Sequence, residues 1–240
     1  MMQTHSLFDH LLVAVLLAAP LINRRWGWPS YLRRLAAGVP GARLKFLRGE
    51  VAAQWVLTLS LLAAWATLHR PWVGLILGGG FTLRLALGLA FAALLIGVLW
   101  LQRRAILRRP KAVERLRVSM AHAEPLLPHT AAERRLFWLV SATAGACEEI
   151  LFRGFLTWYF AVWVGPVAAV LLSSAVFGFG HIYLGWKRVP QTALLGLFFA
   201  LIALATGSLW PAMVLHAAID WNSGELGFRL LSQPAALQEH

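Results

Sequence analysis

The chain has 240 residues, of which 59% are hydrophobic and only 13% are charged, and its formal net charge is +12. Because a soluble domain carries charge on about a quarter of its residues, this composition excludes an ordinary water-facing surface and predicts a polytopic membrane protein. No basic stretch alternates with aromatic residues in a soluble segment, so nucleic acid is not an expected partner. The single cysteine, Cys147, excludes an internal disulfide bond.

Apolar runs follow one another along the chain, at about the 17 to 25 residues that a helix needs to cross a bilayer. We therefore expect an all-α, polytopic transmembrane helix bundle with seven or eight spans. The expected spans are 7–22, 51–68, 83–101, 136–160, 162–184, 192–205 and 209–221, of which the last two are short for a full crossing. The apolar segment 71–82, which Gly78, Gly79 and Gly80 interrupt, is either re-entrant or part of another span.

Basic residues occupy alternate connections between these spans. They gather in 24–48, 103–135 and 187–188, whereas the other connections carry little beyond Arg70 and Arg84. Cytoplasmic loops of membrane proteins carry an excess of lysine and arginine, so the basic connections are expected on the cytoplasmic side. With seven spans the N-terminus lies outside and the C-terminus inside, in what we expect to be a bacterial inner membrane.

The polar stretch 102–135 is the only sizeable soluble loop that we expect. Its segment "AVERLRVSM" (112–120) is either an amphipathic surface helix or a plain basic tether. The chain divides into an N-terminal transmembrane region with basic cytoplasmic loops (1–135), a core (136–224) and a C-terminal tail (225–240). The first 130 residues are expected to add only hydrophobicity.

Ionisable residues interrupt the later apolar runs, and each would cost a few kcal/mol if it faced lipid. We therefore expect them to face the interior and to meet one another. Glu149 and Arg153 are four apart and share one helix face, in the favourable order for an ion pair. Glu148 points about 100° away and lacks a local partner, which leaves it available as a general base. Alternatively, the three residues only hold helices together.

Two further pairs carry imidazoles. Phe177 and His181 are four apart in the fifth expected span, and His216 and Asp220 are four apart in the seventh. Taken alone, His181 is explained as a histidine at the membrane interface. His216 and Asp220, taken alone, are explained as a buried pair whose side chains satisfy each other's hydrogen bonds. Together with Glu148 they can converge in a bundle core. Glu148 with His181 would then take a proton from water, while His216 with its neighbour would stabilise an oxyanion.

Three motifs in order carry a resemblance to a known family. They read "EEILFR" (Glu148 to Arg153), "FGFGH" (Phe177 to His181) and "HAAID" (His216 to Asp220). This pattern resembles the CAAX protease and bacteriocin-processing family, which includes the type II CAAX prenyl endopeptidases. The resemblance covers about residues 136–222. It implies an all-helical intramembrane glutamic endopeptidase whose active site opens toward the cytosol, and it makes 136–224 the protease core.

The resemblance also implies roles for single residues. Glu148 would activate water with His181, and Glu149 and Arg153 would brace the helix. His216 and the residue at position 220 would form the oxyanion site.

Position 220 departs from the pattern of the prenyl endopeptidases, which usually have asparagine there. The carboxylate of Asp220 cannot donate a hydrogen bond to an oxyanion unless it is protonated. Asp220 would instead orient and charge His216, as the aspartate of a catalytic triad does. Asn222 lies roughly 200° further round the helix and is a poor substitute.

A glutamate and two histidines are also a possible zinc set, which here would be Glu148, His181 and His216. The sequence has no His-Glu-x-x-His helix that would fix two ligands locally, so metal-free catalysis without a cofactor is favoured. Cys147 is not expected to be a nucleophile, because no histidine is close in sequence and its surroundings are apolar.

The expected partners are the lipid bilayer and a membrane-associated protein or peptide substrate, with or without a lipid modification. Two functions of other classes stay open at this point. Buried carboxylate–histidine sets also relay protons in transporters, and a non-catalytic membrane scaffold or immunity protein could retain the same fold.

Overall fold

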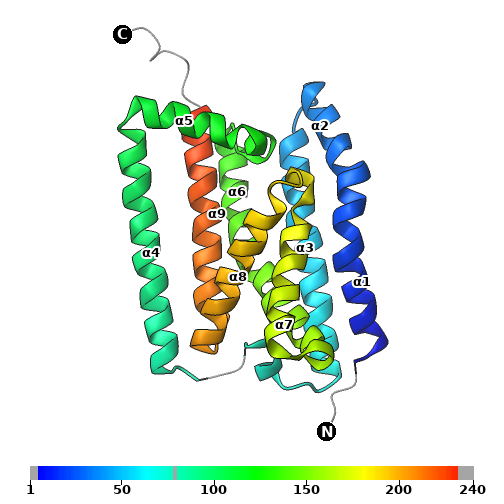
Figure 1. Cartoon of the computed structure of the whole chain (residues 1–240). Coiled ribbons are helices and arrows are strands. Elements are labelled where there is room, and N and C mark those ends of the chain that lie inside the picture. The colour runs from blue at the N-terminus through cyan, green and yellow to red at the C-terminus, as the bar shows by residue number, and fades with distance from the viewer. Residues whose placement is uncertain (1–4, 78–79, 232–240) are drawn as a thin grey trace.

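The computed structural model describes residues 5–77 and 80–231, and the regular elements within these ranges are all helices (Figure 1). The prediction of an all-α protein is confirmed. The α-helices are α1 (Leu7–Ile22), α2 (Trp28–Ala36), α3 (Ala42–Thr67), α4 (Leu83–Leu107), α5 (Pro110–Met120), α6 (Ala131–Glu148), α7 (Thr157–Gly180), α8 (Val189–Thr206) and α9 (Trp210–Leu231). The π-helical segments are η1 (Asn23–Gly27) and η4 (Glu149–Leu156), and the 3-10 segments are η2 (Trp72–Leu75), η3 (Ala121–Leu126) and η5 (Ile182–Leu184).

Several helical segments are long and apolar enough to cross a membrane, as expected of an integral membrane protein. In the described part of the chain there are five, and α9 is not one of them, so the predicted count of seven or eight spans is not confirmed. The five segments are Leu7–Ala36, Ala42–Thr67, Leu83–Leu107, Ala131–Gly180 and Val189–Thr206.

The longest of these segments folds back on itself inside α7. Gly165 has φ 77° and ψ 168°, a backbone conformation that glycine adopts without strain, and Pro166 follows it. Beyond this turn the hydroxyl of Ser173 donates to the carbonyl oxygen of Phe152 at 2.5 Å. The two predicted spans 136–160 and 162–184 therefore lie on either side of one hairpin turn.

The apolar segment 71–82 is only a short turn where the structure describes it. Leu75 in η2 is fully buried, and the backbone N–H of Leu209 donates to the carbonyl of Ile76 at 3.2 Å. This segment therefore packs against the bundle at the start of α9 instead of crossing it. Gly78 and Gly79 lie outside the described residues.

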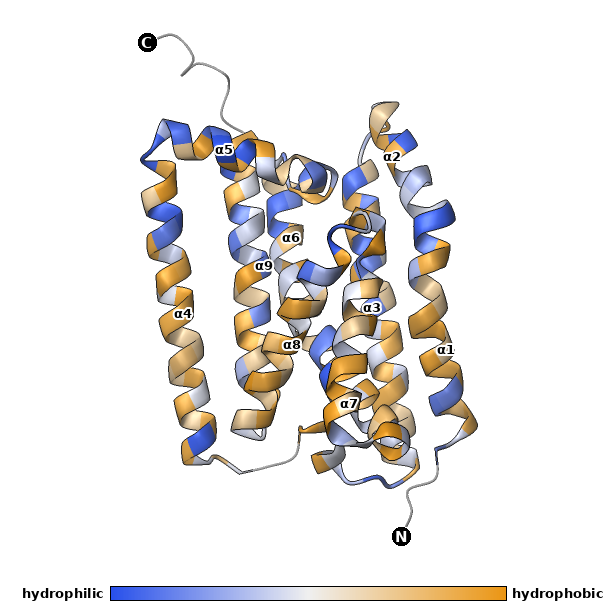
Figure 2. Ribbon diagram, in the orientation of Figure 1, coloured by the Kyte–Doolittle hydropathy of each residue, from blue (hydrophilic) through white to orange (hydrophobic). Residues whose placement is uncertain are grey.

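The three basic connections meet at one end of the bundle, the upper end in Figure 1, where hydrophilic residues concentrate (Figure 2). Backbone and side-chain contacts join them to one another. The contacts are Arg24 Nη1 to Ile182 O (2.7 Å), Arg43 Nε to Pro125 O (3.1 Å) and Arg188 Nη2 to His122 Nδ1 (3.0 Å). The alternation of basic connections in the sequence thus corresponds to a single polar end.

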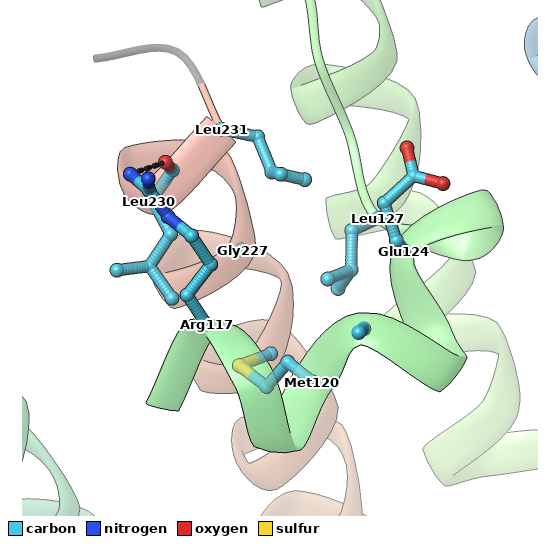
Figure 3. A pocket seen from close by; sticks show the side chains of 8 residues that line it. Arg117, Met120, Glu124, Leu127, Gly227, Leu230 and Leu231 are labelled. Carbon is cyan, nitrogen blue, oxygen red and sulfur yellow. Dashed lines mark hydrogen bonds between the residues drawn. The ribbon is translucent and has the colours of Figure 1, made fainter. Parts of the chain in front are cut away.

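The segment 112–120 lies within helix α5. Of the two alternatives, a surface helix and a plain basic tether, the helix is therefore the one that the structure shows. α5 crosses the polar end instead of running along the bundle (Figure 1), and none of its residues is buried. Between α5, η3 and the end of α9 lies a cavity of about 200 Å³ (Figure 3). Arg117 lines this cavity and donates to the carbonyl of Leu230 at 3.0 Å, which holds α5 against α9.

Close helix contacts set the positions of α6, α7 and α9. A Cβ atom on Gly145 would lie 2.6 Å from the carbonyl oxygen of Met213, so only glycine permits the approach of α6 to α9. Gly178 meets the start of α8 in the same way, at 2.5 Å from Val189 O, whereas Gly180 faces open space. Gly178 therefore permits a close approach of α7 to α8, to which Gly180 does not contribute.

Helix α6 begins within the expected loop 102–135, before the start of the expected span 136–160. Its first residue is Ala131, and Thr130 and Glu133 form a reciprocal capping box at its start. The helix then carries the chain from the polar end into the bundle, where it ends at Glu148.

Candidate active site

The stretch "EEILFRGF" forms the junction between α6 and the π-helical segment η4. π-Helical turns are rare and frequently mark functional sites. The carbonyl of Phe152 accepts from the backbone N–H of Thr157 and also from the hydroxyls of Thr157 (3.2 Å) and Ser173 (2.5 Å). Within η4 the guanidinium Nη1 of Arg153 lies 3.1 Å from Oε1 of Glu149, so the predicted ion pair is confirmed.

Arg153 is one of the most deeply buried charges in the described chain, with 2% of its surface exposed. Its Nε donates to the carbonyl of Gly196 on α8 at 3.3 Å. Its guanidinium carbon lies 4.0 Å from the ring centroid of Phe177 and 5.4 Å from that of Phe199. The carboxylate of Glu149 and two aromatic faces therefore compensate the charge that burial would otherwise penalise.

His216 on α9 shares the same carboxylate. Its Nδ1 lies 2.8 Å from Oε1 of Glu149, and both side chains are buried. The imidazole stacks on Phe199, with ring centroids 4.7 Å apart and planes 17° apart, and Phe177 meets its edge. Because the carboxylate accepts from Nδ1, the ring is held in one orientation with Nε2 free for other partners.

Glu148 occupies the other side of this imidazole. Its Oε1 accepts a hydrogen bond of 3.0 Å from the side-chain amide of Gln54 on α3. Its buried Oε2 has no hydrogen-bond partner among the described residues and lies 3.9 Å from Nε2 of His216. Asp220 Oδ2 lies 3.6 Å from the same nitrogen. Both separations exceed a direct hydrogen bond, so two carboxylates face Nε2 across a short gap.

His181 lies at the border of this group. Its Nδ1 is 3.0 Å from the carbonyl oxygen of Phe177, and its ring lies 6.1 Å from that of Tyr183, centroid to centroid, with the two planes 29° apart. Asp220, whose side chain is 35% exposed, interacts electrostatically with His181 and with Glu148. Among the described residues, no hydrogen bond or ion pair joins His181 to Glu148.

The structure thus brings five of the six predicted residues into direct contact and leaves His181 linked to them electrostatically. The five are Glu148, Glu149, Arg153, His216 and Asp220.

Residues that the sequence reasoning missed complete the site. Gln54 binds Glu148, and Glu50, one turn earlier on α3, lies near enough to Glu148 for their charges to interact. The expectation that the first 130 residues add only hydrophobicity is therefore wrong. The sequence does contain a signal for this pair. Glu50 and Gln54 are four residues apart at the start of an apolar run, so they share one helix face and can meet the same partner.

Tyr183 in η5 is the third missed residue. Burial first, and then the carboxylates of Glu50, Glu148 and Asp220, raise the pKa of its phenol far above the ordinary value. The phenol therefore stays protonated and can donate a hydrogen bond beside the site.

The donor atoms do not converge as a metal site requires. Within residues 5–77 and 80–231, no group of three or more His, Cys, Asp or Glu side chains is arranged to hold a metal ion. The zinc alternative needs Glu148, His181 and His216 on a single ion at about 2 Å each. The Nδ1 hydrogen bonds of His216 to Glu149 and of His181 to the carbonyl of Phe177 leave both Nε2 atoms free, as in metal-ligating histidines, so metal-free catalysis remains a proposal.

Comparison with known proteins agrees with the motifs. Residues 131–222 match the family model described as type II CAAX prenyl endopeptidase Rce1-like. The match runs from the start of α6 into α9 and includes every predicted site residue. The resemblance to CAAX proteases is confirmed, and an intramembrane CAAX protease is the function that this family suggests. No curated protein and no solved structure matches the chain.

Proposed function

We propose that this chain, whose residues 131–222 form an Rce1-like domain of the CAAX protease family, is an intramembrane endopeptidase that hydrolyses its substrate with water activated by Glu148. One observation carries the proposal. The unpartnered Oε2 of Glu148 and the Nε2 of a rigidly held His216 face each other at 3.9 Å, which is too far for a direct bond. A water molecule that binds both atoms would bridge this gap.

In the proposed reaction, Glu148 takes a proton as the water oxygen attacks the carbonyl carbon of the scissile peptide bond. His216, with Nδ1 donating to Glu149, donates from Nε2 of its protonated ring to the developing oxyanion. When the carbon–nitrogen bond breaks, Glu148 returns the proton to the leaving amine. The products are a new carboxylate and a new amine, and the next water restores the starting state.

Asp220 has an orienting role in this mechanism. As a carboxylate it cannot donate to the oxyanion, but its Oδ2 lies 3.6 Å from Nε2 of His216 and favours the charged ring electrostatically. The protonated phenol of Tyr183 and the imidazole of His181 are the other donors near Asp220. We place them where the substrate enters, beside the partly exposed Asp220.

The proposed location follows from the charge distribution. The basic connections gather at one end of the bundle, which supports placing that end on the cytoplasmic side. The membrane that we propose is a bacterial inner membrane. The substrate class is a membrane-associated protein or peptide that presents its cleavage site from this side. Whether the substrate carries a lipid is left to experiment.

The function is tested by comparing membrane peptides from cells that express the wild type or Glu148→Gln at equal levels. The wild type should generate shortened peptides that the variant does not, and the sequences of these peptides identify the substrate. Identical peptide profiles would contradict the protease. In that case, a loss of proton-coupled solute uptake in the variant would indicate a carrier, and no change in either measurement would indicate a scaffold.

A second prediction concerns Gln54, which acts through Glu148 as a positioning residue. In Gln54→Leu the carboxylate loses its hydrogen bond at Oε1, and a bond to a charged group contributes about 1.5–3 kcal/mol. We expect kcat for a reporter peptide to fall about 10- to 100-fold with KM unchanged. Ala53→Leu, at the exposed neighbouring position of α3, is the matched control and should keep the wild-type kcat. A rise in KM at constant kcat would instead place Gln54 in substrate binding.

A further inference from the structure

An apolar cavity of about 370 Å³ lies on the opposite side of Arg153 from the imidazole site. It is bounded by η4, both arms of the α7 hairpin and α8, with η2 at one edge. Apart from Arg153 and Thr157, its wall is made of apolar side chains and glycines. Residues that line it include Arg153, Gly154, Thr157, Ala161, Val170 and Leu201.

The mouth of the cavity faces the membrane. Its rim residues Val167, Leu171, Leu201 and Leu204 have 76%, 53%, 54% and 52% of their surface exposed. All four belong to helical segments apolar enough to span a bilayer, so the medium outside the mouth is hydrocarbon. A buried water needs two to four polar partners, and this wall offers almost none. Water is therefore a poor occupant.

We propose that this cavity is a binding site for one acyl chain of a bilayer phospholipid. A volume of 370 Å³ falls in the range of pockets that bind small molecules. It also exceeds the cavity of about 150 Å³ that is known to admit benzene in an apolar protein core. The chain enters between Val167 and Leu201 and reaches the buried guanidinium of Arg153.

The position of Arg153 gives the bound chain a role in the proposed active site. Arg153 lines the cavity and pairs with Glu149, and Glu149 holds His216. A hydrocarbon chain in the cavity fills the space beside Arg153 and keeps the surroundings of this ion pair apolar. Because electrostatic interactions strengthen in a low dielectric, the lipid holds the Arg153–Glu149–His216 chain in its aligned state.

The test uses the full-length protein in liposomes that contain phosphatidylcholine with a diazirine on one acyl chain. After illumination, adducts are mapped by mass spectrometry. We expect adducts on the cavity residues of 153–171 and 197–204. In Ala161→Phe the new ring fills the cavity, so adducts on Val170 should fall at least fivefold. Val162→Phe adds the same ring at the neighbouring position, which is 51% exposed and lies outside the cavity, and should label like the wild type.

Two results would overturn the lipid site. One is a wild-type map in which lipid-facing surfaces are labelled and Val170 and Gly154 are not, and this result does not depend on the folding of any variant. The other is equal labelling of Val170 in Ala161→Phe and the wild type. The measurement does not involve proteolysis, so the lipid site and the proposed enzymatic activity can fail independently of each other.

Discussion

Glu148→Gln is expected to lower the cleavage rate of a reporter peptide by about 10³-fold in purified protein reconstituted into liposomes. The amide keeps the size of the side chain and can still bind Gln54 through its oxygen at the Oε1 position. It cannot take a proton from the water that we place between this side chain and His216. The variant should therefore bind substrate and fold normally while losing the chemical step, so kcat falls and KM changes little.

The matched control for this variant is Glu124→Gln, a glutamate in η3 at the polar end that contacts Arg43 and His129. It removes a carboxylate of the same kind outside the site and should retain the wild-type kcat. If Glu148→Gln and Glu124→Gln were equally active, Glu148 could not be the base. Thermal unfolding of both variants in detergent shows whether a loss of activity reflects a loss of fold.

Arg153→Met is expected to lower the free energy of unfolding by about 3–5 kcal/mol, because the fully buried carboxylate of Glu149 loses its guanidinium partner and keeps only His216. The methionine fills most of the space of the arginine, so a cavity is not the main cause. Equilibrium unfolding by sodium dodecyl sulfate in mixed micelles measures the change.

Two further variants make this prediction specific. Arg135→Met removes an exposed arginine near the start of α6 and should change the free energy of unfolding by less than about 0.5 kcal/mol. Adding Glu149→Gln to Arg153→Met should restore part of the lost stability, because the unpaired buried charge is gone. A loss of under 1 kcal/mol in Arg153→Met itself would mean that Arg153 does not stabilise the buried Glu149.

Local features of the site could be predicted from sequence because they depend on spacing along one helix. The Glu149–Arg153 pair follows from the four-residue spacing, and the bounds of α1 coincide with the predicted run 7–22. Helix α9 starts at Trp210 with Pro211 as its second residue, in the first turn, where proline is tolerated.

Features that depend on contacts between distant segments were not accessible in this way. The π-helical turn at 149–156 has the same apolar pattern as an α-helix, so periodicity does not reveal it. The hydrogen bond from Gln54 to Glu148 joins α3 to α6 across 94 positions of sequence. The packing of the helices also decides which imidazole faces Glu148. The sequence paired Glu148 with His181. In the structure His216 lies 3.9 Å from Glu148, and His181 interacts electrostatically with Asp220.

The central claim is that Glu148 and His216 act together on one water molecule and on the oxyanion that forms from the substrate carbonyl when this water attacks it. A double-mutant cycle on kcat with Glu148→Gln, His216→Gln and the combined variant tests this claim most directly. Residues that act as one unit show strongly non-additive losses, so the combined variant should be no slower than the slower single variant. If the logarithms of the two losses simply add, the two side chains work independently and the shared-water account is contradicted.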